Sequence, residues 1–163
     1  MKAPGIAIDI PGFGRRILRT VVSDYTGTLS CYGQLTPGVK PLLRRLSKLV
    51  ELAIVTADTY GTALEQLRGI AIPHMLEQKR QDLEKRAFVN RFDLSSVAAF
   101  GNGNNDRLLL RRVREAGGLA IAVDNGEGCA LDAVRSAHLF ISGARNALTL
   151  LLNPNALKAT LRF

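Results

Sequence analysis

The sequence lacks the features that are typical of disulfide-rich, membrane-spanning and secreted proteins. Its 163 residues include no tryptophan and only two cysteines, Cys31 and Cys129. Two cysteines give neither a disulfide framework nor a metal-binding spacing, so we expect free thiols. No apolar run approaches the roughly 20 residues that a membrane-spanning helix needs. The first residues show no signal-peptide pattern, and we therefore expect a cytoplasmic protein with no membrane partner.

Acidic residues are scarce beside basic ones. The chain has 14 Asp and Glu against 22 Lys and Arg, which gives a net charge of +8. Such an excess favours polyanionic or phosphorylated partners, and a solvated basic surface is the alternative. The basic pairs are scattered along the chain without a nucleic-acid-binding motif, so we do not expect a nucleic-acid partner.

The composition that remains is that of a folded domain. Hydrophobic residues make up 47% of the chain and charged residues 22%. A chain of this length can bury one hydrophobic core, so we expect a single domain over residues 1–163.

Strand patterns alternate with helix patterns along most of the chain. This alternation predicts an α/β fold with a mostly parallel sheet. We expect an N-terminal β-hairpin over 1–18, a core over 19–141 and C-terminal helices over 142–163. Thr36 and Pro37 predict the start of the first helix, as its N-cap and first residue. The other expected elements are strands at 6–10, 17–22, 52–55, 70–76, 97–100, 119–123 and 139–141, and helices at 59–67, 81–92, 107–116, 130–136, 144–152 and 155–161.

The stretch 20–29, TVVSDYTGTL, organises the chain. An apolar strand there delivers Asp24 into a tight turn, at the sheet edge where open α/β folds bind ligands. Gly27 permits a sharp turn whose freed N–H groups could face an anion. A strand that ends in a capping aspartate is the alternative.

Polar residues also end two later strands. Thr56 follows the apolar run 52–55, where an N-cap role for Thr56 or Asp58 is the alternative to a functional one. The run 97–100 leads into Gly101-Asn102-Gly103-Asn104-Asn105-Asp106. Taken alone, that hexapeptide is a polar loop in which Asp106 caps the next helix.

Together these segments resemble the haloacid dehalogenase-like (HAD) superfamily. Residues 24–29 resemble its motif D-x-[DT]-G-T-[LV], in the form found in P-type ATPases, and 101–106 resemble the ATPase segment G-D-G-x-N-D. The resemblance runs from about Val21 to Ile141. It implies a three-layer Rossmann-like core and an aspartyl-phosphate mechanism with Mg²⁺ as cofactor.

The resemblance also assigns roles to residues. Asp24 is the expected nucleophile, and Lys85 the basic residue that neutralises it; Lys79 is the competing choice, and a solvated helix lysine is the alternative for both. The implied catalytic residues are Asp24, Thr26 and Lys85. The implied phosphate-binding residues are Gly27, Thr28, Thr56, Ala57 and Lys85. The implied metal ligands are Asp24, the main-chain carbonyl of Thr26, Asn102 and Asp106.

Two departures from the family pattern bear on turnover. Thr26 stands where typical HAD phosphatases have an acid/base aspartate, and Asn102 replaces a metal-binding aspartate. We therefore expect a slow Mg²⁺-dependent phosphohydrolase or phosphotransferase acting on a phosphorylated substrate. A non-catalytic or phospho-accepting interaction module is the alternative.

The spacing of the motifs leaves no room for a cap domain. The segment from Thr56 to Lys85 is too short for one, and the 32 positions that separate Asp24 from Thr56 are too few for the nucleotide-binding domain of the ATPases. The resemblance is thus to capless, soluble P-type ATPase-like proteins. In such a protein, a homo-oligomer partner could cover the open site.

Overall fold

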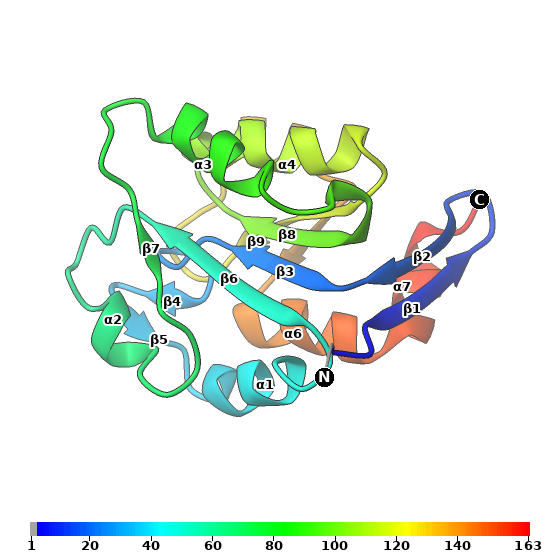
Figure 1. The fold of residues 1–163 in the computed structure, drawn as a ribbon, viewed down its shortest axis with the longest axis horizontal. Coiled ribbons are helices and arrows are strands. Elements are labelled where there is room, and N and C mark those ends of the chain that lie inside the picture. The colour runs from blue at the N-terminus through cyan, green and yellow to red at the C-terminus, as the bar shows by residue number, and fades with distance from the viewer. Residues whose placement is uncertain (1–2) are drawn as a thin grey trace.

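Six strands form one parallel sheet in the computed structural model, which describes residues 3–163 (Figure 1). The spatial order is β10-β9-β8-β3-β6-β7, and every neighbouring pair is parallel. This arrangement confirms the predicted mostly parallel α/β fold. The strands are β3 (Thr20–Ser23), β6 (Glu51–Thr56), β7 (His74–Met75), β8 (Val97–Gly101), β9 (Leu119–Asp124) and β10 (Leu139–Ser142).

Helices cover both faces of the sheet, which gives three layers (Figure 1). One face packs against α3 (Gln81–Val89), α4 (Arg107–Glu115) and α5 (Leu131–Ser136). The other face packs against α1 (Val39–Leu46) and α6 (Ala144–Leu152). Because side chains alternate along a strand, Val21 and Val22 of β3 enter the two opposite hydrophobic cores, and neither is exposed.

The N-terminal residues form the expected antiparallel hairpin, β1 (Ile6–Ile10) with β2 (Gly14–Leu18). The hairpin projects from one end of the sheet and packs against α7 (Pro154–Leu161) (Figure 1). The expected strand over 17–22 is interrupted at Arg19, whose N–H donates to the Ser96 carbonyl 2.7 Å away. The chain therefore leaves the hairpin at Leu18 and joins the main sheet at Thr20.

The prediction that Thr36 and Pro37 begin the first helix is wrong. Helix α1 begins at Val39, after Gly38 has adopted the left-handed conformation at φ +87°. The Thr36 hydroxyl accepts a hydrogen bond from Asn125 Nδ2 at 2.7 Å. This contact ties Thr36 to the loop after β9, so its side chain is unavailable as a cap.

The segment between β6 and α3 is less regular than expected. The helix predicted over 59–67 is reduced to α2 (Ala63–Gln66), because the chain turns at Asp58 and Gly61, both with positive φ. The strand predicted over 70–76 is reduced to β7 at the sheet edge. Residues 57–80 thus contribute one short helix and one short strand at the periphery of the core.

Two short strands follow Asp24, β4 (Ser30–Cys31) and β5 (Gln34–Leu35), and form a small flap. A short 3₁₀ helix, Leu94–Ser96, precedes β8, and another, Asn104–Asp106, precedes α4. None of the helices described in residues 3–163 has the length and apolar character that a membrane crossing requires.

Candidate active site

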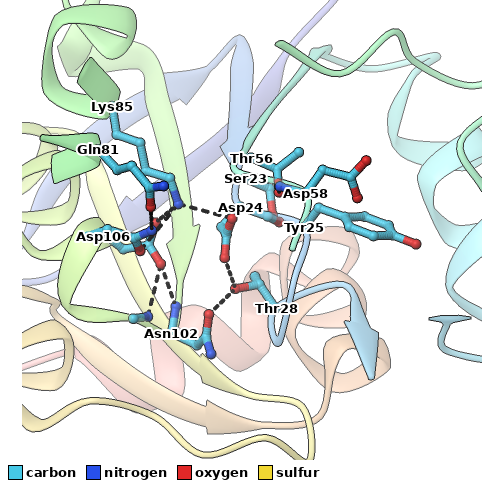
Figure 2. Close-up of polar contacts among 12 residues, drawn as sticks. Ser23, Asp24, Tyr25, Thr28, Thr56, Asp58, Gln81, Lys85, Asn102 and Asp106 are labelled. Atoms are coloured by element: carbon cyan, nitrogen blue, oxygen red, sulfur yellow. Dashed lines mark hydrogen bonds and ion pairs between the residues drawn. The ribbon is translucent and has the colours of Figure 1, made fainter. Parts of the chain in front are cut away.

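The register of the sheet brings three strand ends together. Ser23, the last residue of β3, lies opposite Ile54 of β6 and Phe100 of β8. The Asp24 N–H continues this pairing by donating to the Phe100 carbonyl at 3.0 Å. Asp24, Thr56 and Asn102 therefore emerge at the same edge of the sheet, as their positions after apolar runs predicted (Figure 2).

Lys85 links two carboxylates at this edge. Its Nζ lies 3.0 Å from Asp24 Oδ1 and 2.7 Å from Asp106 Oδ1, and its side chain is fully buried. Helix α3 carries this ammonium group toward the end of β3, where Figure 2 shows it between the two aspartates. Of the two lysines considered from the sequence, Lys85 is the one in contact with Asp24.

Asp106 is held in place by the loop that precedes it. Its Oδ2 accepts hydrogen bonds from the N–H groups of Asn102 at 3.0 Å and Gly103 at 2.9 Å. The side chain makes no cap on α4, so it turns back into the loop. Gly101 is needed for this approach, because a Cβ there would lie 2.5 Å from the Asp106 side chain.

The turn after Asp24 also fixes the position of Asn102. Thr28 Oγ1 lies 3.4 Å from Asp24 Oδ2 and 3.2 Å from Asn102 Oδ1. Gly27 has φ +74°, and a Cβ at this position would overlap the Asn102 amide. The Gly27 and Thr28 N–H groups donate to the Ser30 and Tyr25 carbonyls within the turn. These two N–H groups are therefore engaged within the turn, whereas the Thr28 hydroxyl points toward Asp24 and Asn102.

A pocket of about 230 Å³ opens over these strand ends. Thr26 Oγ1 is buried beside it and has no hydrogen-bond partner within residues 3–163. Thr56 Oγ1 accepts from the Asp58 N–H at 2.9 Å, which leaves its own proton free. Asp58 Oδ1 accepts from the N–H groups of Thr62 and Ala63, so it is Asp58 that caps this turn. The pocket is lined by Asp24, Thr26, Thr56, Ala57, Thr59, Gln81, Asn102, Gly103 and Asn105.

Four lining residues are not among the site residues expected from the sequence, namely Thr59, Gln81, Gly103 and Asn105. Gln81 precedes Lys85 by four residues, so both lie on one face of α3 (Figure 2). Asn105 donates to Gln81 Oε1 at 3.0 Å, and its Oδ1 lies 3.5 Å from Lys85 Nζ. The helical spacing from Lys85 is the signal that could have identified Gln81.

Burial shifts the pKa values of the charged groups. Burial and the nearby Asp106 raise the pKa of Asp24 to about 7, although Lys85 acts in the opposite direction. Burial opposes the charge on Lys85, but Asp106 and Asp24 outweigh it and raise the Lys85 pKa. When both aspartates are ionised, the two carboxylates and one ammonium leave one net negative charge, which favours binding of a cation.

Some of the oxygen atoms at the site are suitable ligands for a hard cation such as Mg²⁺. Asp24 Oδ2 and Asn102 Oδ1 face each other across the Thr28 hydroxyl, and carboxylate and amide oxygens are ligands of this class. Both oxygens of Asp106 are engaged by Lys85 and the loop N–H groups. Residues 3–163 contain no cluster of three or more His, Cys, Asp or Glu side chains placed for a metal. Main-chain oxygen and water would therefore complete the coordination.

Sequence comparison links the chain to an archaeal protein. No protein-family model matches the chain. Over 66 residues it is 42% identical to the uncharacterized protein MJ0073 of Methanocaldococcus jannaschii; the match spans 40% of this chain and 67% of that protein. The two chains belong to one family, and the uncharacterized relative does not indicate its activity.

The likeness to solved structures extends over most of the chain. The chain resembles 3-deoxy-D-manno-octulosonate 8-phosphate phosphatase from Moraxella catarrhalis, solved with magnesium, phosphate and the sugar acid KDO. The TM-score is 0.63 at 18% identity, over 89% of this chain and 94% of that one. It also resembles the haloacid dehalogenase-like hydrolase SP0104 from Streptococcus pneumoniae, with a TM-score of 0.58 at 13% identity over 83% and 99%. The chain therefore has the fold of the haloacid dehalogenase-like superfamily of phosphatases.

Proposed function

We propose that the protein is an Mg²⁺-dependent phosphohydrolase that works through an aspartyl-phosphate intermediate on Asp24. The observation that carries this proposal is the buried Asp24–Lys85–Asp106 cluster at the open end of the sheet. A fully buried charged cluster is costly to maintain, and perturbed groups of this kind gather at functional sites. The likeness to phosphatases of the same fold supports the reaction class.

Asp24 is the proposed nucleophile because it faces the pocket from a fixed position. Its carboxylate would attack phosphorus as the bond from phosphorus to the leaving oxygen breaks, forming an acyl phosphate. Water would then attack the same phosphorus, which releases inorganic phosphate and restores the carboxylate. The contact with Lys85 Nζ keeps Asp24 oriented and favours its ionised form.

The surrounding residues would position the phosphoryl group. The free proton of Thr56 and the unpartnered hydroxyl of Thr26 both border the pocket, where they can donate to phosphoryl oxygens. Ala57 lines the same pocket. Asp106 has no free oxygen, so we propose that it positions Lys85 and the 101–106 loop, in place of the direct metal contact that the resemblance implied.

Asp24, Asn102 and the Thr26 carbonyl are the proposed holders of Mg²⁺. When bound, the ion supplies charge neutralisation for the transferring phosphoryl group. With Asn102 in place of an aspartate, the protein contributes less negative charge to the metal. We therefore expect weak metal affinity.

Thr26 makes a second function worth separate consideration. A threonine hydroxyl cannot protonate a leaving group or activate water at neutral pH, and no acidic side chain replaces it along the pocket wall. A protein with this site could accept a phosphoryl group and retain it, acting as a phospho-accepting module. Stable labelling by acetyl phosphate without release of phosphate would favour this second function.

Phosphate release from a generic aryl phosphate tests the main proposal. We expect activity that requires Mg²⁺ and falls by about 10³-fold or more in Asp24→Asn, since loss of a nucleophile removes the covalent route. Asp132→Asn, a surface aspartate paired with Arg135, is the matched control and should retain activity. Undiminished turnover in Asp24→Asn would rule out the proposed mechanism.

A further inference from the structure

A basic groove adjoins the candidate phosphoryl pocket. It has a volume of about 400 Å³ and is lined by Lys79, Arg80, Gln81, Asp82, Asn104, Asn105 and Arg107. Gln81 and Asn105 line both the groove and the phosphoryl pocket. Their side chains are hydrogen-bonded to each other at 3.0 Å, so a single amide pair separates the two spaces.

The groove keeps an excess of positive charge after its internal pairs are counted. Arg80 binds both oxygens of Asp82 at 3.0 Å, and Arg107 Nη2 shares Asp82 Oδ2 at the same distance. Two guanidinium groups thus share one carboxylate, and each has N–H groups left over. Lys79 has no ion-pair partner within residues 3–163.

Two acidic side chains lie near the rim of the pocket around Thr59, although neither lines it. In Figure 2, Asp58 and Gln81 lie on opposite sides of Asp24. Glu127 accepts hydrogen bonds from the Tyr32 N–H and the Tyr60 hydroxyl, at 3.0 and 3.1 Å, so it lies close to the segment that follows Asp58. An anionic group next to a bound phosphoryl group would be repelled from this rim and attracted toward the groove.

We propose that the basic groove is a subsite for a second anionic group on the substrate. The substrate class is then a small phosphomonoester that carries, on the same molecule, a further phosphate or a carboxylate. This inference rests on the proposed function, because it takes the Asp24 pocket as the place of the transferred phosphate. It also gives Lys79, the competitor of Lys85 at the sequence level, a role in recognition.

Matched ligand pairs test the subsite by binding, independently of turnover. Calorimetric titrations in excess Mg²⁺ would compare fructose 1,6-bisphosphate with fructose 6-phosphate, and 3-phosphoglycerate with glycerol 3-phosphate. The first pair adds a phosphate and the second a carboxylate, so the pairs also identify which anion is preferred. The variants are Lys79→Gln and Arg80→Gln, with Lys48→Gln, an exposed lysine beyond α1, as the matched control.

We expect the dianionic member of at least one pair to bind about tenfold more tightly, as a charged hydrogen bond allows. That advantage should shrink about tenfold in Lys79→Gln or Arg80→Gln, persist in Lys48→Gln and weaken as salt is added. Equal affinities within both pairs, or an advantage that survives both groove variants, would overturn the subsite. Turnover measured on the same ligands reports the proposed function separately: a binding preference without hydrolysis contradicts the hydrolase alone, and hydrolysis without preference contradicts the subsite alone.

Discussion

In the proposed mechanism, Thr26 limits the rate of turnover. Its hydroxyl is buried beside the pocket without a hydrogen-bond partner in residues 3–163. In the motif that residues 24–29 resemble, typical HAD phosphatases have the acid/base aspartate at this position. Thr26→Asp should raise kcat by about 10²-fold or more, because general acid–base catalysis contributes that much. Steady-state phosphate release measures the change. Thr26→Asn is the matched control, because asparagine is similar in size to aspartate but has no titratable group. An equal gain in kcat in Thr26→Asn would refute the acid/base explanation.

Asp24 carries a cost in stability that its removal should reveal. Its pKa is about 7 in the folded protein and near 3.8 when unfolded, so the folded state binds the proton more tightly. The contribution of the protonated Asp24 to the free energy of unfolding is therefore lost as the pH rises from about 4 to about 7. At pH 8 without Mg²⁺, Asp24→Asn should unfold with a free energy at least about 1 kcal/mol larger than the parent.

Urea unfolding at pH 5 and pH 8 measures this difference. The gain of Asp24→Asn should be larger at pH 8 than at pH 5, because only at pH 8 is the parent carboxylate forced to ionise. If Asp24→Asn is less stable than the parent at pH 8, the ion pair with Lys85 outweighs the burial of the charge.

His138 should make the fold sensitive to acid. Its Nδ1 accepts from the Ala120 N–H at 3.0 Å, which requires the neutral ring. Burial, Arg114 and Arg16 lower the His138 pKa to about 4, below its usual 6.5. The stability from the neutral ring is thus complete above pH 6.5 and is lost as the pH falls toward 4.

We expect this group to account for about 1–2 kcal/mol of the stability lost between pH 7 and pH 5. His138→Asn keeps an acceptor near the Nδ1 position but cannot titrate, so its pH dependence over this range should be flatter. Parallel pH profiles of the parent and His138→Asn, from denaturant unfolding, would show that His138 is not the sensitive group.

Helix α7 anchors the N-terminal hairpin to the body of the molecule. Leu157 is fully buried between α7 and the core that includes Ile8 and Ile10 of β1. Leu157→Ala should lower the free energy of unfolding by about 2–4 kcal/mol, from lost burial and the cavity left behind. The kcat of the folded protein should be unchanged, because the hairpin lies at the opposite end of the sheet from the site (Figure 1).

Ile72→Ala is the control for this substitution. Ile72 is 88% exposed, so its truncation should change stability by less than about 0.5 kcal/mol. Urea midpoints of both variants provide the comparison, and similar losses in the two would contradict the proposed anchoring role.

The strands and helices of the core were predictable because their patterns are local. The runs before Asp24 and Asn102 are mostly apolar and are buried at every position, as strands in the middle of a parallel sheet should be. The start of α1 was not predictable, since Thr36 is held by Asn125, 89 residues away in the chain. A contact of that range leaves no local signal, and the rule for N-caps gave the wrong residue.

The site was predictable only in part for a similar reason. Asp24, Thr56, Lys85, Asn102 and Asp106 follow from strand ends and from motifs, and the structure gathers them at one edge. The engagement of both Asp106 oxygens depends on the path of the 101–106 loop, which the residue types do not specify. The basic groove depends on the packing of α3 beside that loop, and it too has no sequence motif.

The whole molecule combines an open site with a positive surface. The net charge is +8, and the segment between β6 and α3 adds only α2 and β7 to the core. In our account, recognition therefore depends on charged groups at the rim of the sheet, and the chemistry depends on Asp24. The covalent intermediate on Asp24 underlies the other proposed roles, because each of them is defined relative to it.

The phosphorylated protein can be trapped to detect this intermediate. The protein would be mixed with acetyl phosphate and Mg²⁺, quenched in acid, and digested for mass spectrometry. We predict one added phosphoryl group on the peptide containing Asp24, sensitive to hydroxylamine as an acyl phosphate is, and absent from Asp24→Asn. Label on another residue, or label that persists in Asp24→Asn, would contradict a covalent intermediate on Asp24.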